Sequence, residues 1–401
     1  MRVSKESIRD YTVLFMLLCV SGNPVFSISG AFSKVCPLLF FLFLIAVYWK
    51  TIKKRTILEM VAAAASLALI FAFQRFILGY VSIKACANYI VKFLSAIIVA
   101  HALGARFKDR YIRIMGLLAA VSLFFFTLEA LGIKFPPLFH TEHNGDSILI
   151  HNYLNTDASR YGRVLRNCGM FWEPGVFSGY LILALVLFAN RPFLLLSKYK
   201  IQLVVIILAV VTTKSTSGYL MLFLVGLYIL YRSLSNRISR LVLVTVLALG
   251  TIIAVINTPF LGDKIANEIE SIEDQDPEDI NFSRLGSFVF DLQYIGQHPL
   301  FGNGLAGKTR YALHNDVFDL ELLQAFSNGF SGCAASMGLL FLVTFFVLIG
   351  INPTLSSKAF LIISVILLLQ GEYFLSYSLF MALPFIDYSI PSPSDRTCKE
   401  E

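Results

Sequence analysis

The chain has 401 residues, of which 57% are hydrophobic and 15% are charged, whereas ordinary globular proteins have about 45–50% and about 25%. A chain this apolar cannot cover its hydrophobic area with polar residues in water, so it must be solvated by lipid. This excludes a cytosolic enzyme, a nucleic-acid-binding domain and a secreted disulfide scaffold, and the net charge of +7 has to be interpreted by where the charges lie.

Apolar runs bounded by charged residues recur along the chain and predict transmembrane helices, since strand-type alternation is absent and lipid tolerates no unpaired backbone. Several runs are shorter than the roughly 20 residues that cross a bilayer, so we expect about 12 spans, between about 10 and 14. The expected spans are Tyr11–Phe32 (interrupted at Gly22-Asn23-Pro24), Val35–Trp49, Ile57–Phe73, Ala85–Leu103, Ile112–Leu131, Gly175–Phe188, Ile201–Thr213, Gly218–Tyr231, Leu241–Ile256, Phe330–Ile351, Ala359–Leu369 and Tyr373–Ile386. The fold class is therefore all-α, a polytopic membrane protein with one integral membrane domain over residues 1–401.

The orientation follows from the basic residues of the short connections, which gather on the cytoplasmic side of membrane proteins. One set of alternate connections, together with both ends of the chain, holds 20 of the 33 Lys and Arg residues. The basic start of the chain is not closed by a small-residue cleavage site, so we expect a retained first helix rather than a signal peptide. We therefore expect a multi-pass membrane protein with both termini in the cytoplasm.

Two connections are too long to be turns, about 132–173 and about 257–329, and this topology places both outside the cytoplasm. Long loops in compact proteins usually carry function. Ionisable residues at the membrane edge are also functional candidates. On this outer side they are Arg160, Arg163, Arg166, Glu173, Lys214, Arg284 and Glu372. Cations opposite a few carboxylates suit an anionic ligand, and the planar donor fork of arginine suits phosphate especially.

The run from Arg166 to Gly175 reads R-N-C-G-M-F-W-E-P-G. Glu173 followed by Pro174 is typical of a helix N-terminus, where an acid and a first-turn proline are both favourable. Glu173 can therefore be a capping residue, but the dense group of Arg, Trp, Glu, Pro and Gly beside a long loop also fits a site.

Four stretches together make the chain resemble the O-antigen polymerase and ligase family (Wzy-like), which are membrane glycosyltransferases acting on polyprenyl-diphosphate-linked glycans. They are Arg166–Gly179, Thr212–Leu220 (T-T-K-S-T-S-G-Y-L), Ser283–Gly304 (S-R-L-G-S-F, then H-P-L-F-G-N-G) and Ser327–Gly338, with Gly371–Leu383 as a closing similarity. Their order and topology carry the resemblance, which covers roughly residues 160–385.

The resemblance implies a protein of the bacterial cytoplasmic (inner) membrane. It also implies inverting transfer of a growing glycan from its undecaprenyl diphosphate to a new acceptor, without metal or cofactor. Arg284 and Arg166 would hold the diphosphate with help from Lys214, since a leaving diphosphate is stabilised by cations. Glu173 would be the base for the acceptor hydroxyl. Asn328 and Glu372 would contact substrate. Family members often place a His or Asn in the segment that matches Ser327-Asn328-Gly329, and Asn cannot act as a base, so His314 is a spare candidate.

Two other signals are weaker. The G-x-G-x-x-G pattern from Gly302 to Gly307 has no βαβ unit around it, so a tight loop is favoured over nucleotide binding. His140, His143 and His151 match no strong zinc spacing, so we expect surface histidines and no metal site.

Three functions remain open. The first is a polymerase of repeat units for O-antigen, capsule or exopolysaccharide, with a chain-length regulator as an expected partner. The second is the related ligase, which usually has a clearer His in the second loop. The third is a flippase or transporter of lipid-linked sugars, which would line a central cavity with charge from both sides; here the notable charges crowd the outer side.

Overall fold

The computed structural model describes residues 5–27, 30–141, 145–153, 165–234, 236, 238–239, 242, 245, 284–314 and 328–389. The helices are α1 Lys5–Gly22, α2 Pro24–Ser27, α3 Gly30–Tyr48, α4 Lys54–Leu78, α5 Ile83–Leu103, α6 Arg106–Ala130, α8 Pro174–Val186, α9 Pro192–Ser197, α10 Lys200–Thr213, α11 Thr216–Ser233, α14 Arg284–Gln297, α15 Gly307–Arg310, α17 Gly329–Ile351, α18 Lys358–Leu369 and α19 Ser378–Met381. Short 3₁₀ turns are η1 Ala312–His314, η2 Phe374–Ser376 and η3 Leu383–Phe385, and the strands are β1 Phe139–Thr141, β2 Gly145–Ser147 and β3 Asn152–Tyr153.

The protein is mostly helical, and four helices of its described part are long and apolar enough to cross a membrane: α4, α5, α6 and α17. α4 also carries large apolar side chains on its outer face, with Leu58 69% and Phe76 87% exposed. An exposed apolar helix face of this kind is expected against lipid rather than water. These helices indicate an integral membrane protein.

The expectation of about 12 spans is wrong for the described residues, where the number is four. Phe32–Tyr48 of α3, α8, α10 and α18 are apolar but shorter than the four long helices, and a span needs roughly 20 residues. The run expected over Tyr373–Ile386 consists of η2, the four-residue α19 and η3 rather than one helix. Most of the run Leu241–Ile256 lies outside the described residues.

The first expected span is broken at Asn23, because the side chain of this residue forms hydrogen bonds with backbone groups around it. Its Nδ2 donates to the carbonyl oxygens of Leu149 at 2.7 Å and Met170 at 3.0 Å. Its Oδ1 accepts from the backbone N–H of Val25 and so begins α2. Proline at position 24 lacks the N–H that would continue α1.

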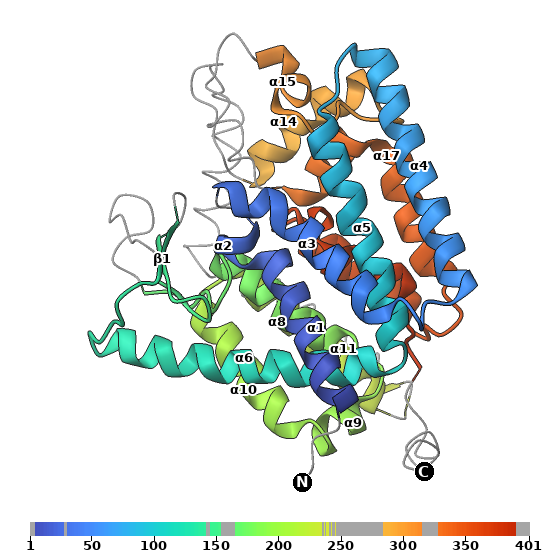
Figure 1. Cartoon of the computed structure of the whole chain (residues 1–401). Coiled ribbons are helices and arrows are strands. Elements are labelled where there is room, and N and C mark those ends of the chain that lie inside the picture. The colour runs from blue at the N-terminus through green and yellow to red at the C-terminus, as the bar shows by residue number, and fades with distance from the viewer. Residues whose placement is uncertain are drawn as a thin grey trace.

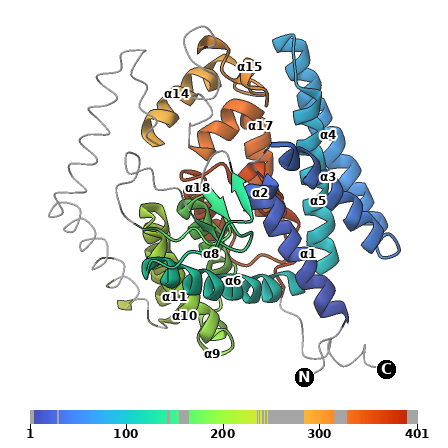
Figure 2. The same ribbon diagram turned by 60° about the vertical axis from the view of Figure 1, so that its left-hand side comes forward.

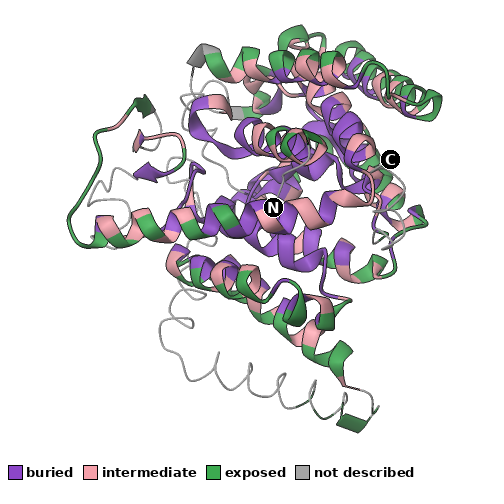
Figure 3. Ribbon diagram, turned by 60° about the horizontal axis from the view of Figure 1, so that its bottom comes forward, coloured by how far each residue is buried: buried purple, intermediate pink, exposed green. Residues whose placement is uncertain are grey.

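α8 is the centre of the fold, since each of its residues is buried. It packs against α6, α10 and α11, and Figures 1 and 2 show it inside the other helices. Figure 3 shows the buried residues gathered in the middle and the exposed ones on the outer helices. The packing of α8 therefore holds in place the chain segments directly before and after this helix.

α17 is interrupted at Gly338, where φ is 83°. The residues before and after the break pair with the loop 299–304: Asn303 donates to the carbonyl of Ala335 at 2.8 Å, and Leu339 donates to that of Pro299 at 2.8 Å. Backbone groups freed by a break in an apolar helix need such partners. The Gly302–Gly307 pattern is thus part of a tight loop against α17.

Each long loop contains structure that the sequence did not predict. The first contains a three-stranded antiparallel sheet in the order β1-β2-β3, in which Phe139 pairs with Ser147 and Asp146 pairs with Tyr153. The second contains α14, α15 and η1. In Figure 1, α14 and α15 lie at the top and α9 lies at the bottom.

Candidate functional site

The site is built around the N-terminus of α8. Glu173 is the residue before the helix, in an extended conformation (φ −149°, ψ 146°), and Pro174 occupies the first turn. The Glu173 side chain is half-buried and makes no hydrogen bond to the first-turn N–H groups. The Glu173 carboxylate therefore does not cap α8. Within the described residues we also find no ion pair to this carboxylate.

Arg166 and Asn167 attach this segment to the end of α10. Arg166 Nε donates to the carbonyl oxygen of Thr213 at 3.1 Å, and its Nη2 donates to that of Lys214 at 3.2 Å. Asn167 donates from its backbone N–H to Thr212 O at 3.0 Å and from Nδ2 to Thr212 Oγ1 at 2.9 Å. A cation at a helix C-terminus is favourable because the carbonyl ends carry partial negative charge.

Lys214 ends α10 in the left-handed conformation (φ 49°), with an exposed side chain. Arg166 and Lys214 thus bring two positive charges to the same turn, beside the start of α8. Two of the Arg166 donors already bind backbone carbonyls, which fixes the guanidinium in place.

Asn328 lies at the start of α17 and uses both ends of its amide. Its Oδ1 accepts from the backbone N–H groups of Phe330 and Ser331 at 3.1 Å each, and its Nδ2 donates to Gln370 Oε1 at 2.9 Å. Asn328 is a helix cap of the usual type. It also ties α17 to the residues that follow α18.

Two contacts join the closing stretch 371–383 to the others. The ring of Trp172, which is buried, lies 5.0 Å from the ring of Tyr377 between centroids. Glu372 is buried, and its backbone lies directly against Gly329. The segment ending in Glu173, the start of α17 and the turn after α18 therefore form one packed region.

A buried ion pair that the sequence did not predict adjoins this region. Asp291 of α14 binds Arg310, and both side chains are almost fully buried. Ser331 Oγ donates to Asp291 Oδ2 at 2.6 Å, so the pair is bonded to α17. The guanidinium of Arg310 also lies 5.0 Å and 4.8 Å from the ring centroids of Tyr294 and Tyr311.

Burial is the largest influence on Asp291 and raises the pKa of its carboxyl, while Arg310 and Ser331 act in the opposite direction. Burial also raises the pKa of Tyr294 to about 12. The only signals for this pair in the sequence are that Asp291 is the sole acid of α14 and that Arg310 follows a glycine-rich loop.

The remaining candidates are described only in part. Arg284 is the first residue of α14, two turns before Asp291, and His314 is the last residue of η1; the side chains of both lie outside the described residues. Arg160 and Arg163 lie outside them altogether.

The expectation of surface histidines is wrong for His151. Its side chain is 1% exposed, its Nε2 lies 3.4 Å from Glu129 Oε2, and its ring stacks on Phe125 at 5.5 Å. His140 is exposed and pairs with Asp146 at 2.7 Å between Nδ1 and Oδ1. No group of three or more metal-ligating side chains occurs within the described part of the chain.

No known family model matches the chain, and a search of curated proteins finds no match either.

Proposed function

We propose that the protein is a membrane glycosyltransferase that polymerises oligosaccharide repeat units carried on undecaprenyl diphosphate. The product would be a surface polysaccharide such as O-antigen, capsule or exopolysaccharide. The reaction would take place on the outer face of the bacterial cytoplasmic membrane, with both termini in the cytoplasm. A chain-length regulator is the expected protein partner.

The observation that carries the proposal is that stretches far apart in the sequence pack together. Arg166 and Asn167 bind the turn at Thr212–Lys214, and Trp172 lies on Tyr377. Through Ser331 and Asp291, α17 is bonded to the helix that Arg284 begins. These are the stretches on which the resemblance to polymerases and ligases depends.

The reaction needs a base for the acceptor hydroxyl and cations for the leaving diphosphate. The acceptor hydroxyl attacks the anomeric carbon of the growing chain, its proton passes to Glu173, and the bond from that carbon to the diphosphate oxygen breaks. The leaving group is undecaprenyl diphosphate, and Arg284, Arg166 and Lys214 neutralise its charge. Fixed cations are effective here because they need not reorganise as charge develops.

The carboxylate of Glu173 is suited to the base role because it is held at a helix start yet bonds no helix N–H. A base must reach the reacting hydroxyl within hydrogen-bond distance. Asn328 has its amide committed to the cap of α17 and to Gln370. Asn328 therefore supports the shape of the site. Glu372 lies against Gly329 in the same packed region, and its assigned role is contact with the substrate.

The test is a gel of surface glycan from a strain that lacks the gene, run beside the complemented strain. A polymerase predicts that the ladder collapses to the core with a single repeat unit and that complementation restores it. Loss of that single unit, with long lipid-linked chains accumulating, would replace the proposal by a ligase. Single lipid-linked units held on the cytoplasmic leaflet would replace it by a flippase and would remove Glu173 from any catalytic role.

A further inference from the structure

A cavity of about 380 Å³ lies at the far end of the bundle from the candidate site. It is lined by Val186 at the end of α8, by Leu187 and Phe188 directly after it, and by residues that follow α17, among them Thr354. Glu173 directly precedes α8, and Asn328 directly precedes α17. Because 13 helical residues span about 20 Å, the cavity and the candidate site lie at opposite ends of the same two helices.

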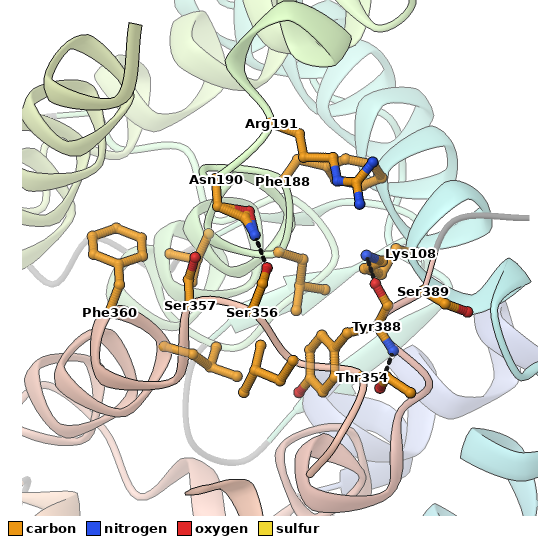
Figure 4. A pocket seen from close by; sticks show the side chains of 14 residues that line it. Lys108, Phe188, Asn190, Arg191, Thr354, Ser356, Ser357, Phe360, Tyr388 and Ser389 are labelled. Carbon is orange, nitrogen blue, oxygen red and sulfur yellow. Dashed lines mark hydrogen bonds between the residues drawn. The ribbon is translucent and has the colours of Figure 1, made fainter. Parts of the chain in front are cut away.

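Two cations meet at this cavity. Lys108 and Arg191 both line it, and Lys108 is only 6% exposed. Figure 4 shows the two side chains beside each other, with Phe360 and Ser357 on the other side. Arg191 repels the Lys108 ammonium, and Asp387 attracts it more weakly.

The charge of Lys108 is only partly compensated. Its Nζ donates to the carbonyl oxygen of Tyr388, and the ammonium lies 5.7 Å from the ring centroid of Phe188 and 5.9 Å from that of Tyr388. An ammonium has three N–H donors. Within the described residues no ion pair joins Lys108 or Arg191 to a carboxylate, and a buried cation without one is unfavourable unless another anion is present.

The N-terminus of α18 faces the same space. Ser357 precedes this 12-residue helix and makes no side-chain cap, while Phe360 and Leu361 of its first turn line the cavity. Uncapped N–H groups and the positive end of the helix dipole favour an anion. The hydroxyl groups of Ser356, Ser357 and Ser389 also line the cavity and can donate to an anion, whereas the hydroxyl of Thr354 already donates to Asn352 Oδ1 at 2.8 Å.

We propose that this cavity binds a phosphate group through Lys108, Arg191 and the N-terminus of α18. The segments that line it belong to the connections rich in Lys and Arg, which the positive-inside rule assigns to the cytoplasm. The phosphate would therefore come either from the headgroup of an anionic phospholipid in the inner leaflet or from a soluble phosphate compound. Binding would join the ends of α6, α8 and α18 and the segment at Tyr388.

The test uses the purified full chain in phosphatidylcholine nanodiscs, with thermal unfolding as the readout. One arm titrates inorganic phosphate, and the other replaces part of the lipid by phosphatidylglycerol. A rise in Tm with phosphate alone assigns a soluble ligand, and a rise with phosphatidylglycerol alone assigns a headgroup. Either outcome supports the site, provided that it depends on Arg191.

Arg191→Gln is the decisive variant, because Arg191 is exposed and its loss need not disturb the fold. We expect it to weaken the apparent affinity about tenfold, which is the effect of one charge-assisted hydrogen bond. Lys200→Gln removes an exposed charge at the start of α10 that does not line the cavity, and this variant should bind as the wild type does. No Tm shift with either probe, or the same shift in both variants, would overturn the proposal.

The readout is binding rather than polymerisation. A failure here leaves the proposed glycosyltransferase untouched, and a failure of the glycan-ladder experiment leaves this site untouched.

Discussion

Gly329 and Glu372 lie backbone against backbone: a β-carbon on Gly329 would overlap the carbonyl oxygen of Glu372. This contact brings the first residue of α17 against the turn that follows α18. Because the opposing atoms are backbone, no side-chain rotation can make room. The closeness of these two segments, and with it the shape of the candidate site, depends on the absence of a side chain at position 329.

Replacing Gly329 by alanine should therefore destabilise the protein by about 1–3 kcal/mol, the usual effect of overpacking, and should reduce polymer synthesis. Thermal unfolding of the purified variant measures the first effect and the glycan ladder the second. The matched control is Gly350→Ala in the same helix, where a β-carbon meets nothing within 4 Å. An unchanged Tm for Gly329→Ala would mean that the two segments can separate freely.

Arg284 is expected to hold the leaving diphosphate. Arg284→Ala should abolish polymerisation while the amount of protein in the membrane stays normal. Arg284→Lys should also fail, since an ammonium does not reproduce the bidentate donor fork. Lys84→Ala, which removes an exposed charge at the start of α5, is the control. Full activity of Arg284→Lys would show that only charge matters at this position.

Arg166 is expected to hold the diphosphate together with Arg284. In the structure, two N–H donors of Arg166 also bind the end of α10. Arg166→Ala should abolish polymerisation and also lower Tm, because the carbonyls of Thr213 and Lys214 lose their partner. Membrane levels and Tm are measured beside the ladder. Polymer of normal length from Arg166→Ala would remove Arg166 from the mechanism.

Glu173→Gln keeps the shape of the side chain but removes its capacity to accept a proton. We expect polymerisation to fall about 100-fold or more, in line with the usual contribution of a general base. Tm should not change, since the carboxylate makes no cap to α8. Incorporation of repeat units in membrane vesicles gives the rate. Wild-type incorporation by Glu173→Gln would assign the base to another group.

The Asp291–Arg310 pair leads to a prediction about pH. Arg310→Met leaves a buried carboxylate without its cation, so it should destabilise the protein by about 3–5 kcal/mol near pH 7. Burial already raises the pKa of Asp291 above its value in the unfolded chain. For such an acid, the contribution that favours the fold is present below the unfolded pKa and is lost as pH rises through the folded pKa.

The deficit of Arg310→Met should therefore shrink as pH falls and Asp291 becomes protonated, which thermal unfolding at pH 7 and at about pH 4 measures. The double variant with Asp291→Leu and Arg310→Met should be more stable than Arg310→Met alone, because it leaves no unpaired buried charge. A deficit that does not vary with pH would mean that Asp291 is not ionised in the wild-type protein.

Much of the membrane character could be predicted from composition, since apolar runs such as Ile57–Phe73 and Phe330–Ile351 fall within α4 and α17. Within the described residues, run length alone overestimated the number of spans. The segment Tyr373–Ile386 has the apolar composition expected of a transmembrane helix. It nevertheless folds into short turns that pack on α5, α1 and α17. A buried apolar segment and a lipid-facing one have the same composition, and only their neighbours distinguish them.

In the candidate site too, some features follow from the sequence and others only from the tertiary structure. The sequence by itself determined that this is a largely helical membrane protein and that Glu173-Pro174 begins a helix, because both depend on the local solvation and backbone preferences of the residues involved. Only the tertiary structure decided that Arg166 binds the turn at Thr213, that Asn328 binds Gln370, and that Asp291 meets Arg310. These partners lie 19 to 47 residues apart, and their pairing depends on how the helices pack, which no local pattern encodes.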